Sequence, residues 1–148
     1  MLVASALLFP ALGAGPLERA EIYFLDGARG MLETGDLVVP RYQGQAFFDK
    51  PILSYWLMAG AFEALGTRAV AARGVSALAA LGGVLAAAWL GRRLFGDETA
   101  LAGAAVLATT LTFVAFGRIA MSDLLLTLFT TPAVAVAAHA FWKTDAPA

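Results

Sequence analysis

Four side chains of this 148-residue sequence could do chemistry, and all four lie beside long apolar runs. Glu21, Asp49 and Asp123 are carboxylates, which can accept or donate a proton during a reaction, and Lys50 is a cation next to Asp49. If residues 17–33 form a helix, Glu21 falls in the middle of its apolar face. A carboxylate where burial is expected is costly unless it is paired or used, so Glu21 is a candidate catalytic residue.

Each of these side chains also has an ordinary structural interpretation. Asp49 and Asp123 could cap the N-termini of helices that begin beside them. Lys50 could reach toward lipid headgroups, and Glu21 could pair with an arginine such as Arg29. The spacing of the residues alone leaves both interpretations open.

The composition indicates a membrane protein. Hydrophobic residues make up 60% of the chain and charged residues only 14%, whereas roughly a quarter of the residues of soluble proteins are charged. Three segments, 74–91, 99–117 and 124–142, contain no charged residue and are each 18 or 19 residues long. About 20 residues are needed to cross a bilayer as a helix. The net charge of −1 gives no reason to expect a nucleic acid partner, and the absence of cysteine excludes disulfides and thiolate metal sites.

A fourth apolar run occupies the first 17 residues and contains Pro10. It could be a first membrane helix or a signal peptide, although it lacks the positively charged start of such a peptide. We therefore predict an all-α, multi-spanning membrane protein. Its four transmembrane helices are expected at about 1–16, 72–91, 100–117 and 124–142. His139, in the last of these, is expected to serve helix packing.

The positions of the arginines predict how the spans are oriented in the membrane. Arg92 and Arg93 lie in the short turn between the second and third spans, which the positive-inside tendency places in the cytoplasm. The outer loop 18–71 and the turn before Asp123 then lie on the opposite side. Within the outer loop we expect short juxtamembrane helices. The first ends near Gly35, the second starts at Pro51, and the third starts at Thr67 and continues into the second span, with strand character only at 37–39.

Four separated motifs occur in the same order as in a known family of membrane enzymes. The segments EIYFLDGARGMLETGDLVVPRYQGQAFFDKPILSYWLMA, AARGVSALAAL, GRRLFG and GRIAMSDLLLTLF resemble the membrane glycosyltransferases of family 39. These include protein O-mannosyltransferases and lipid A aminoarabinose transferases. The resemblance covers the chain from Glu18 to about Phe129. It implies that residues 1–148 correspond to the N-terminal part of a C-type glycosyltransferase membrane domain, in a family whose members are several times longer.

The resemblance also implies roles for individual residues. Glu21 and Asp123 match catalytic acids, and Lys50 matches a lysine associated with the lipid phosphate, with Arg118 as a second cation. The family has an acid immediately before Glu21, where this chain has Ala20. Asp49 resembles a position implicated in binding a divalent metal in some relatives.

The implied activity is transfer of a hexose or pentose from a polyprenyl-phosphate-linked donor to a lipid or protein acceptor. The implied location is the bacterial inner membrane, with the site facing the periplasm or exterior and in contact with membrane lipid. A transporter or a non-catalytic membrane subunit is the alternative. A transporter would place polar residues near the middle of its spans, where substrate pathways run.

Overall fold

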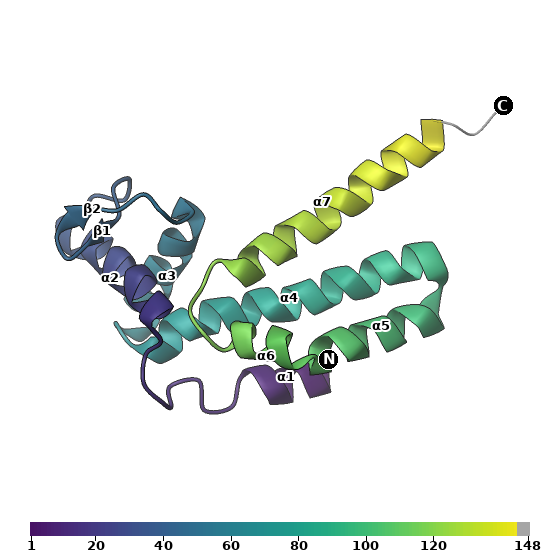
Figure 1. The fold of residues 1–148 in the computed structure, drawn as a ribbon, viewed down its shortest axis with the longest axis horizontal. Helices are drawn as coiled ribbons and strands as arrows, with labels where there is room; N and C mark the ends of the chain where they lie inside the picture. The colour runs from purple at the N-terminus through teal and green to yellow at the C-terminus, as the bar shows by residue number, and fades with distance from the viewer. Residues whose placement is uncertain (145–148) are drawn as a thin grey trace.

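The computed structural model describes residues 1–144, with side chains through residue 137. Its helices are α1 (Leu2–Leu8), α2 (Arg19–Thr34), α3 (Ile52–Leu65), α4 (Ala69–Phe95), α5 (Asp97–Thr109), α6 (Leu111–Gly117) and α7 (Asp123–Thr144) (Figure 1). One antiparallel hairpin in the described part joins β1 (Arg41–Tyr42) and β2 (Gln45–Ala46). The chain is mostly helical, as predicted. The side chain of His139 lies outside the described residues.

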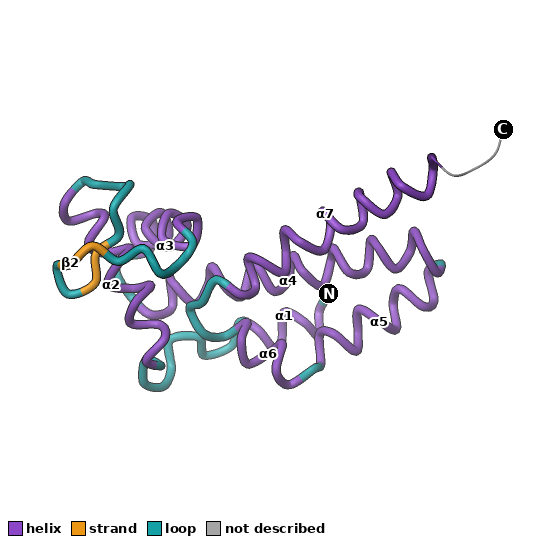
Figure 2. The backbone as a smooth tube through the Cα atoms, turned by 45° about the horizontal axis from the view of Figure 1, so that its top comes forward, coloured by secondary structure: helices purple, strands orange, loops and turns teal. Residues whose placement is uncertain are grey.

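The elements form a head and a bundle (Figures 1 and 2). The head comprises α2, the hairpin and α3, which together cover residues 19–65. The bundle comprises α1, α4, α5, α6 and α7, with α4 at its centre, where α5, α6 and α7 all pack against it. The N-terminal part of α4 packs against α3 of the head, and Arg92 and Arg93 lie in the last turn at its opposite end.

Helix α2 has the amphipathic character that its sequence predicts. Phe24, Ala28 and Met31 are buried in one cluster with residues of α3, and Glu21 is buried on the same helix. The helix ends at Gly35, which has φ +71 as a left-handed C-cap. Helix α3 follows Pro51 and buries Tyr55, Met58 and Phe62 against the apolar face of α2. The predicted third helix and second span form one continuous helix, α4.

Large apolar side chains also cover the outside of the bundle. Leu78 of α4, Leu101 of α5 and Leu126 of α7 are 62%, 74% and 65% exposed, respectively. The interior is built from small residues, such as Ala77 and Ala80 of α4, which allow close helix contact. A helix that is apolar on all sides is typical of a lipid environment rather than of water.

The first predicted span is shorter than expected. Helix α1 ends at Leu8 rather than near residue 16, because Pro10 has no N–H to continue the helix and restricts the residue before it. Ala11 then adopts φ +54, a left-handed conformation that turns the chain.

The third predicted span is broken. Helices α5 and α6 meet at Thr110 with a bend of 64°. Within the described residues, α4 alone is long and apolar enough to cross a membrane, or two spans are present if α5 and α6 count as one. The predicted segments 72–91 and 124–142 fall inside α4 and α7, while the number of four spans stays a prediction.

The strand prediction was wrong. Residues 37–39 form no strand, because the Asp36 carboxylate accepts hydrogen bonds from the Val38 and Val39 amides at 3.0 and 3.2 Å and bends the chain. The hairpin lies directly afterwards, and Gln43 and Gly44 form its turn with φ +51 and +79. These two short strands leave the described chain mostly helical, in agreement with the predicted class.

Candidate functional site

Glu21 is completely buried and fully hydrogen-bonded. Its Oε1 accepts from Arg73 Nε and from the Ala120 amide, both at 2.8 Å. Its Oε2 accepts from Arg73 Nη2 and from the Glu18 amide, also at 2.8 Å. A carboxylate offers about four lone-pair positions, and this geometry fills all of them. The arginine partner is Arg73 rather than the suggested Arg29, which pairs with Glu33.

Burial by itself would raise the pKa of Glu21, because it disfavours the charged form. The hydrogen bonds from Arg73 and from the Ala120 and Glu18 amides outweigh burial, so that the pKa lies below its ordinary value. A lower pKa makes the carboxylate a weaker base. The geometry thus favours the structural interpretation of Glu21, while its catalytic role stays a prediction.

Arg73 uses all five of its N–H donors. In addition to the two bonds to Glu21, its Nη groups donate to the carbonyls of Leu12, Ala14 and Pro16 at 2.9, 3.0 and 2.9 Å. The guanidinium therefore ties the chain between α1 and α2 to the start of α4. A planar group with five donors suits this task, whereas a lysine would offer three.

Arg118 binds the end of α1 and the residue Pro10 just after it. Its Nη1 donates to the carbonyls of Leu7 and Leu8 at 2.8 and 3.2 Å, and its Nη2 donates to that of Pro10 at 2.7 Å. A cation at these carbonyls satisfies groups that the end of α1 leaves free. The predicted role of Arg118 toward a phosphate stays a prediction, and in this structure its Nη groups are used for α1.

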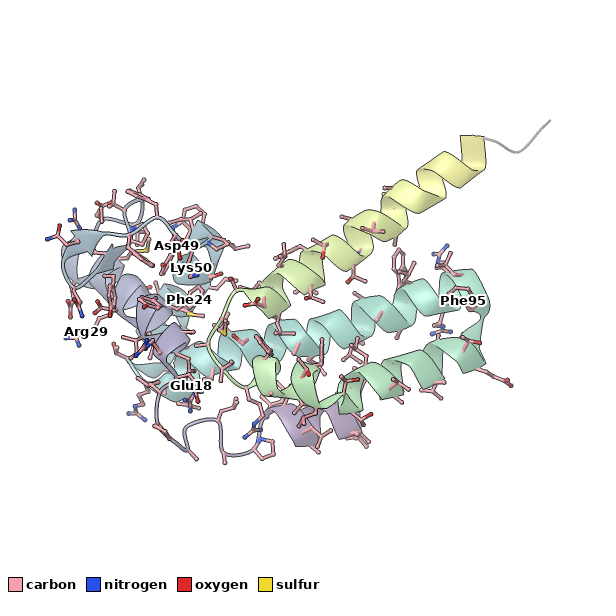
Figure 3. All side chains as sticks on the ribbon, in the orientation of Figure 1. Glu18, Phe24, Arg29, Asp49, Lys50 and Phe95 are labelled. Atoms are coloured by element: carbon pink, nitrogen blue, oxygen red, sulfur yellow. The ribbon has the colours of Figure 1, made fainter. Side chains whose placement is uncertain are left out.

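Lys50 and Asp49 form a separate charged pair on the head. Lys50 Nζ lies 3.0 Å from Asp49 Oδ2, and the Asp49 side chain is 66% exposed. Both residues come just before α3, and Figure 3 shows them beside that helix on the head. The cap of α3 is Pro51, with no side-chain hydrogen bond, so the capping interpretation of Asp49 is not realised. The Lys50 side chain is 34% exposed, so its ammonium can still be reached by an anionic ligand.

Asp123 is the first residue of α7 and is exposed to solvent. Its carboxylate forms no hydrogen bond or ion pair with the described residues, whereas its own carbonyl accepts from the Thr127 hydroxyl at 2.9 Å. Helix α7 begins at the head end of the bundle (Figure 1). Asp123 therefore has a free carboxylate at the helix N-terminus, on the same end of the molecule as Lys50.

The structure joins only some of the predicted site residues. Glu21 binds the backbone of Ala120, three residues before Asp123, and Asp49 pairs with Lys50. No hydrogen bond or ion pair among the described residues connects Lys50 with Glu21 or Asp123. Sequence reasoning assigned no role to Arg73, although Arg73 lies in the motif AARGVSALAAL and directly before the charge-free segment 74–91. A lone arginine at the start of an apolar helix is the signal that could have revealed it.

The predicted metal position offers a single carboxylate. Within residues 1–137, no three His, Cys, Asp or Glu side chains come together in a group that could hold a metal ion. Asp49 is partnered by a cation, and one carboxylate does not by itself make a divalent site. The described residues therefore offer no group of ligands around Asp49, and a divalent metal stays a prediction.

The family model described as "Dolichyl-phosphate-mannose-protein mannosyltransferase" matches residues 49–146, a range that includes Lys50, Arg118 and Asp123. The chain belongs to this family. The predicted resemblance to family 39 glycosyltransferases is thereby confirmed.

Curated relatives of known description are similar over most of the chain. An undecaprenyl phosphate-alpha-4-amino-4-deoxy-L-arabinose arabinosyl transferase from Pseudomonas fluorescens is 34% identical over 122 residues, which cover 81% of this chain and 20% of the relative. The corresponding transferase from Edwardsiella ictaluri is 30% identical over 123 residues, or 82% of this chain and 22% of the relative. The chain thus spans about a fifth of the length of these relatives.

The fold has a counterpart among solved structures. ArnT from Cupriavidus metallidurans, in a crystal structure bound to undecaprenyl phosphate, superposes with a TM-score of 0.83 and 24% sequence identity. The match covers 90% of this chain and 25% of that protein. The apo structure of the same protein matches equally well. The arrangement of head and bundle is therefore that of the corresponding quarter of ArnT.

Proposed function

We propose that the complete gene product containing this chain transfers a sugar from a polyprenyl-phosphate-linked donor to a lipid or protein acceptor at the outer face of the inner membrane. The observation that carries this proposal is the family match, which includes the cation Lys50 and the free carboxylate Asp123. The named activity of the curated relatives and the shared fold support it. Undecaprenyl phosphate, which appears in their names, is the proposed lipid carrier, and the sugar is a pentose or hexose.

In the proposed reaction, an acceptor hydroxyl attacks the anomeric carbon of the donor sugar. The bond between that carbon and the phosphate oxygen breaks, and polyprenyl phosphate leaves with the bonding electrons. Lys50 is proposed to approach the phosphate and stabilise the charge that develops on it. This requires Lys50 Nζ to exchange Asp49 for the phosphate, which is feasible because the pair lies at the surface.

Asp123 is the proposed base that accepts the acceptor's proton. The family's acid before Glu21 is replaced by Ala20, which cannot take a proton. Glu21 has no free lone pair in this conformation. Tyr55 is no substitute, because burial and then the charge of Asp49 raise its pKa to about 12. Asp123 has an exposed and unpaired carboxylate within the described residues, so it fits the role best.

The proposed topology places the head outside and the turn with Arg92 and Arg93 in the cytoplasm. Exposed apolar side chains along the bundle support its position in lipid. The buried polar residues of α4 are Arg73 and Ser76, both within its first eight residues and close to the head. A transporter pathway would need such groups at mid-span, so this distribution favours the enzyme over the transporter.

Mass spectrometry of lipids and proteins from cells with and without the complete gene tests the proposed function. We expect that deletion removes one glycosylated lipid or protein species and that the intact gene restores it. A gene carrying Lys50→Met should fail to restore that species while the protein still accumulates in the membrane. Unchanged glycolipids and glycoproteins after deletion would contradict the proposal.

A further inference from the structure

The turn that leads into Asp123 is held by side chains from other elements. This turn, residues 118–122, connects α6 with α7. The Ala120 amide donates to Glu21 Oε1 at 2.8 Å. Both backbone polar groups of Met121 bind the hydroxyl of Ser76, because the Met121 amide donates to Ser76 Oγ and Ser76 Oγ donates to the Met121 carbonyl, each at 3.1 Å.

Ser76 is suited to hold the backbone on both sides of Met121 in a fixed orientation. It lies one turn after Arg73 on α4, and it is completely buried. A hydroxyl can donate one hydrogen bond and accept others, so a single atom satisfies both the N–H and the C=O of Met121. These groups lie before the first turn of α7 and outside its hydrogen-bond ladder. Without Ser76 they would lose their partner inside the protein.

Asp123 depends on this turn for its position. Its carboxylate has no partner among the described residues, so its own side-chain contacts do not fix it. The backbone two residues earlier is held by Ser76, and the backbone three residues earlier is held by Glu21. A rigid turn restricts where the carboxylate can lie, and misplacing a reacting group by about 1 Å can cost about 100-fold in rate.

We propose that Ser76 is a positioning residue for Asp123 in the transfer reaction, acting through its two hydrogen bonds to Met121. This inference rests on the proposed function, because it requires Asp123 to take part in catalysis. Ser76 does not itself touch the reacting atoms. Its removal should lower kcat while the KM for the lipid donor, which depends on Lys50, stays the same.

The test uses three matched substitutions in the complete gene product, purified in lipid nanodiscs. Ser76→Ala removes the hydroxyl and keeps the helix, since alanine is the strongest helix former. Ser76→Thr restores a hydroxyl at the same place. Ser54→Ala is the control, because Ser54 is a buried serine of the neighbouring helix α3 and the hydrogen bonds that hold the turn come from Ser76 and Glu21 instead.

Two readouts are compared for each variant. Hydrogen exchange of a peptide covering 118–123 reports on the turn, and we expect about tenfold faster exchange in Ser76→Ala and wild-type exchange in Ser54→Ala. Kinetics should show at least a tenfold lower kcat in Ser76→Ala with an unchanged KM for undecaprenyl-phosphate-linked sugar. Ser76→Thr should recover most of both losses.

The outcomes separate this inference from the proposed function. Unchanged exchange in Ser76→Ala overturns the claim that Ser76 holds the turn. Faster exchange with unchanged kcat, or a change confined to KM, overturns the claim that the turn positions a catalytic group. If wild-type protein transfers sugar and Asp123→Asn is equally active, the assignment of Asp123 fails instead, whatever Ser76 does.

Discussion

A buried carboxylate is stable only where hydrogen bonds and an opposite charge replace the water that it has lost. Glu21 meets both conditions, with four donors around two oxygens. Its partner Arg73 also holds three carbonyls of the segment before α2. The pair therefore joins four parts of the chain, namely the segment after α1, α2, α4 and the turn before α7.

Replacing Glu21 should destabilise the protein in a pH-dependent way. Glu21→Gln leaves the charge of Arg73 buried without its counter-charge, which costs about 3–5 kcal/mol. Because the folded-state pKa of Glu21 lies below the ordinary value of 4.5, its stabilisation is complete above pH 4.5 and is lost as pH falls through the folded-state pKa. Denaturant unfolding between pH 3 and 7 should show a large deficit at neutral pH that shrinks in acid.

Glu33→Gln is the matched control for that experiment. Glu33 lies on the same helix but is exposed, and it pairs only with Arg29 on the surface. Such a pair contributes roughly 0–1 kcal/mol, so its loss should have little effect. Equal and pH-independent effects of the two substitutions would refute the structural role assigned to Glu21.

The sequence could predict part of this residue-level arrangement. The helical period places Glu21 on the apolar face of α2, and the structure confirms its burial. The period could not identify the partner, because Arg73 is 52 residues away and comes near only when α2 and α4 both pack against α3. Nor could it show that Arg118 would use its guanidinium for the carbonyls of α1.

At the scale of elements, the contact between α2 and α3 depends on one glycine. The ring of Tyr55 packs directly over Gly27, so closely that an added Cβ would overlap Tyr55 Cε1 and lie 2.8 Å from Cδ1. The Tyr55 hydroxyl is buried without a hydrogen-bond partner among the described residues. Shape rather than hydrogen bonding therefore fixes this contact.

Gly27→Ala should destabilise the head despite the better helix propensity of alanine. Overpacking a buried contact typically costs about 1–3 kcal/mol, which exceeds the gain of about 1 kcal/mol from replacing a helical glycine. Gly30→Ala is the control, because the nearest atoms to its added Cβ, in Arg41, lie 3.7 Å away. Thermal unfolding should give a lower Tm for Gly27→Ala and an equal or higher Tm for Gly30→Ala. A higher Tm for both would show that Tyr55 can move aside.

Helix boundaries show where sequence patterns are insufficient. Charge-free segments correctly predicted α4 and α7 but not the break between α5 and α6 at Thr110. The break lies at Thr110, whose backbone has ψ 121, and a hydropathy average over many residues does not reveal the conformation of one residue. At the end of α5, the Thr109 and Thr110 hydroxyls donate to carbonyls of the preceding turn at 2.8 Å. Pro10, by contrast, was a visible signal that α1 would be short.

At the scale of the whole molecule, charged residues lie at the two ends and apolar side chains cover the surface between them, as expected of a protein that spans a membrane. Figure 3 shows Asp49 and Lys50 on the head, whereas Phe95 marks the far end of α4, where Arg92 pairs with Asp97 at 2.7 Å. Between these ends the outer surface carries large apolar side chains. The sequence could predict this division because it depends only on where charged residues are absent.

Transfer of a radiolabelled sugar by the purified complete gene product tests the central claim most directly. The donor is undecaprenyl-phosphate-linked sugar, and the acceptor is a membrane lipid or protein fraction from the deletion strain. We expect label in the acceptor with equimolar release of undecaprenyl phosphate, and a loss of at least about 100-fold in kcat for Asp123→Asn. Absence of transfer by the wild-type protein, or transfer by Asp123→Asn at the wild-type rate, would contradict it.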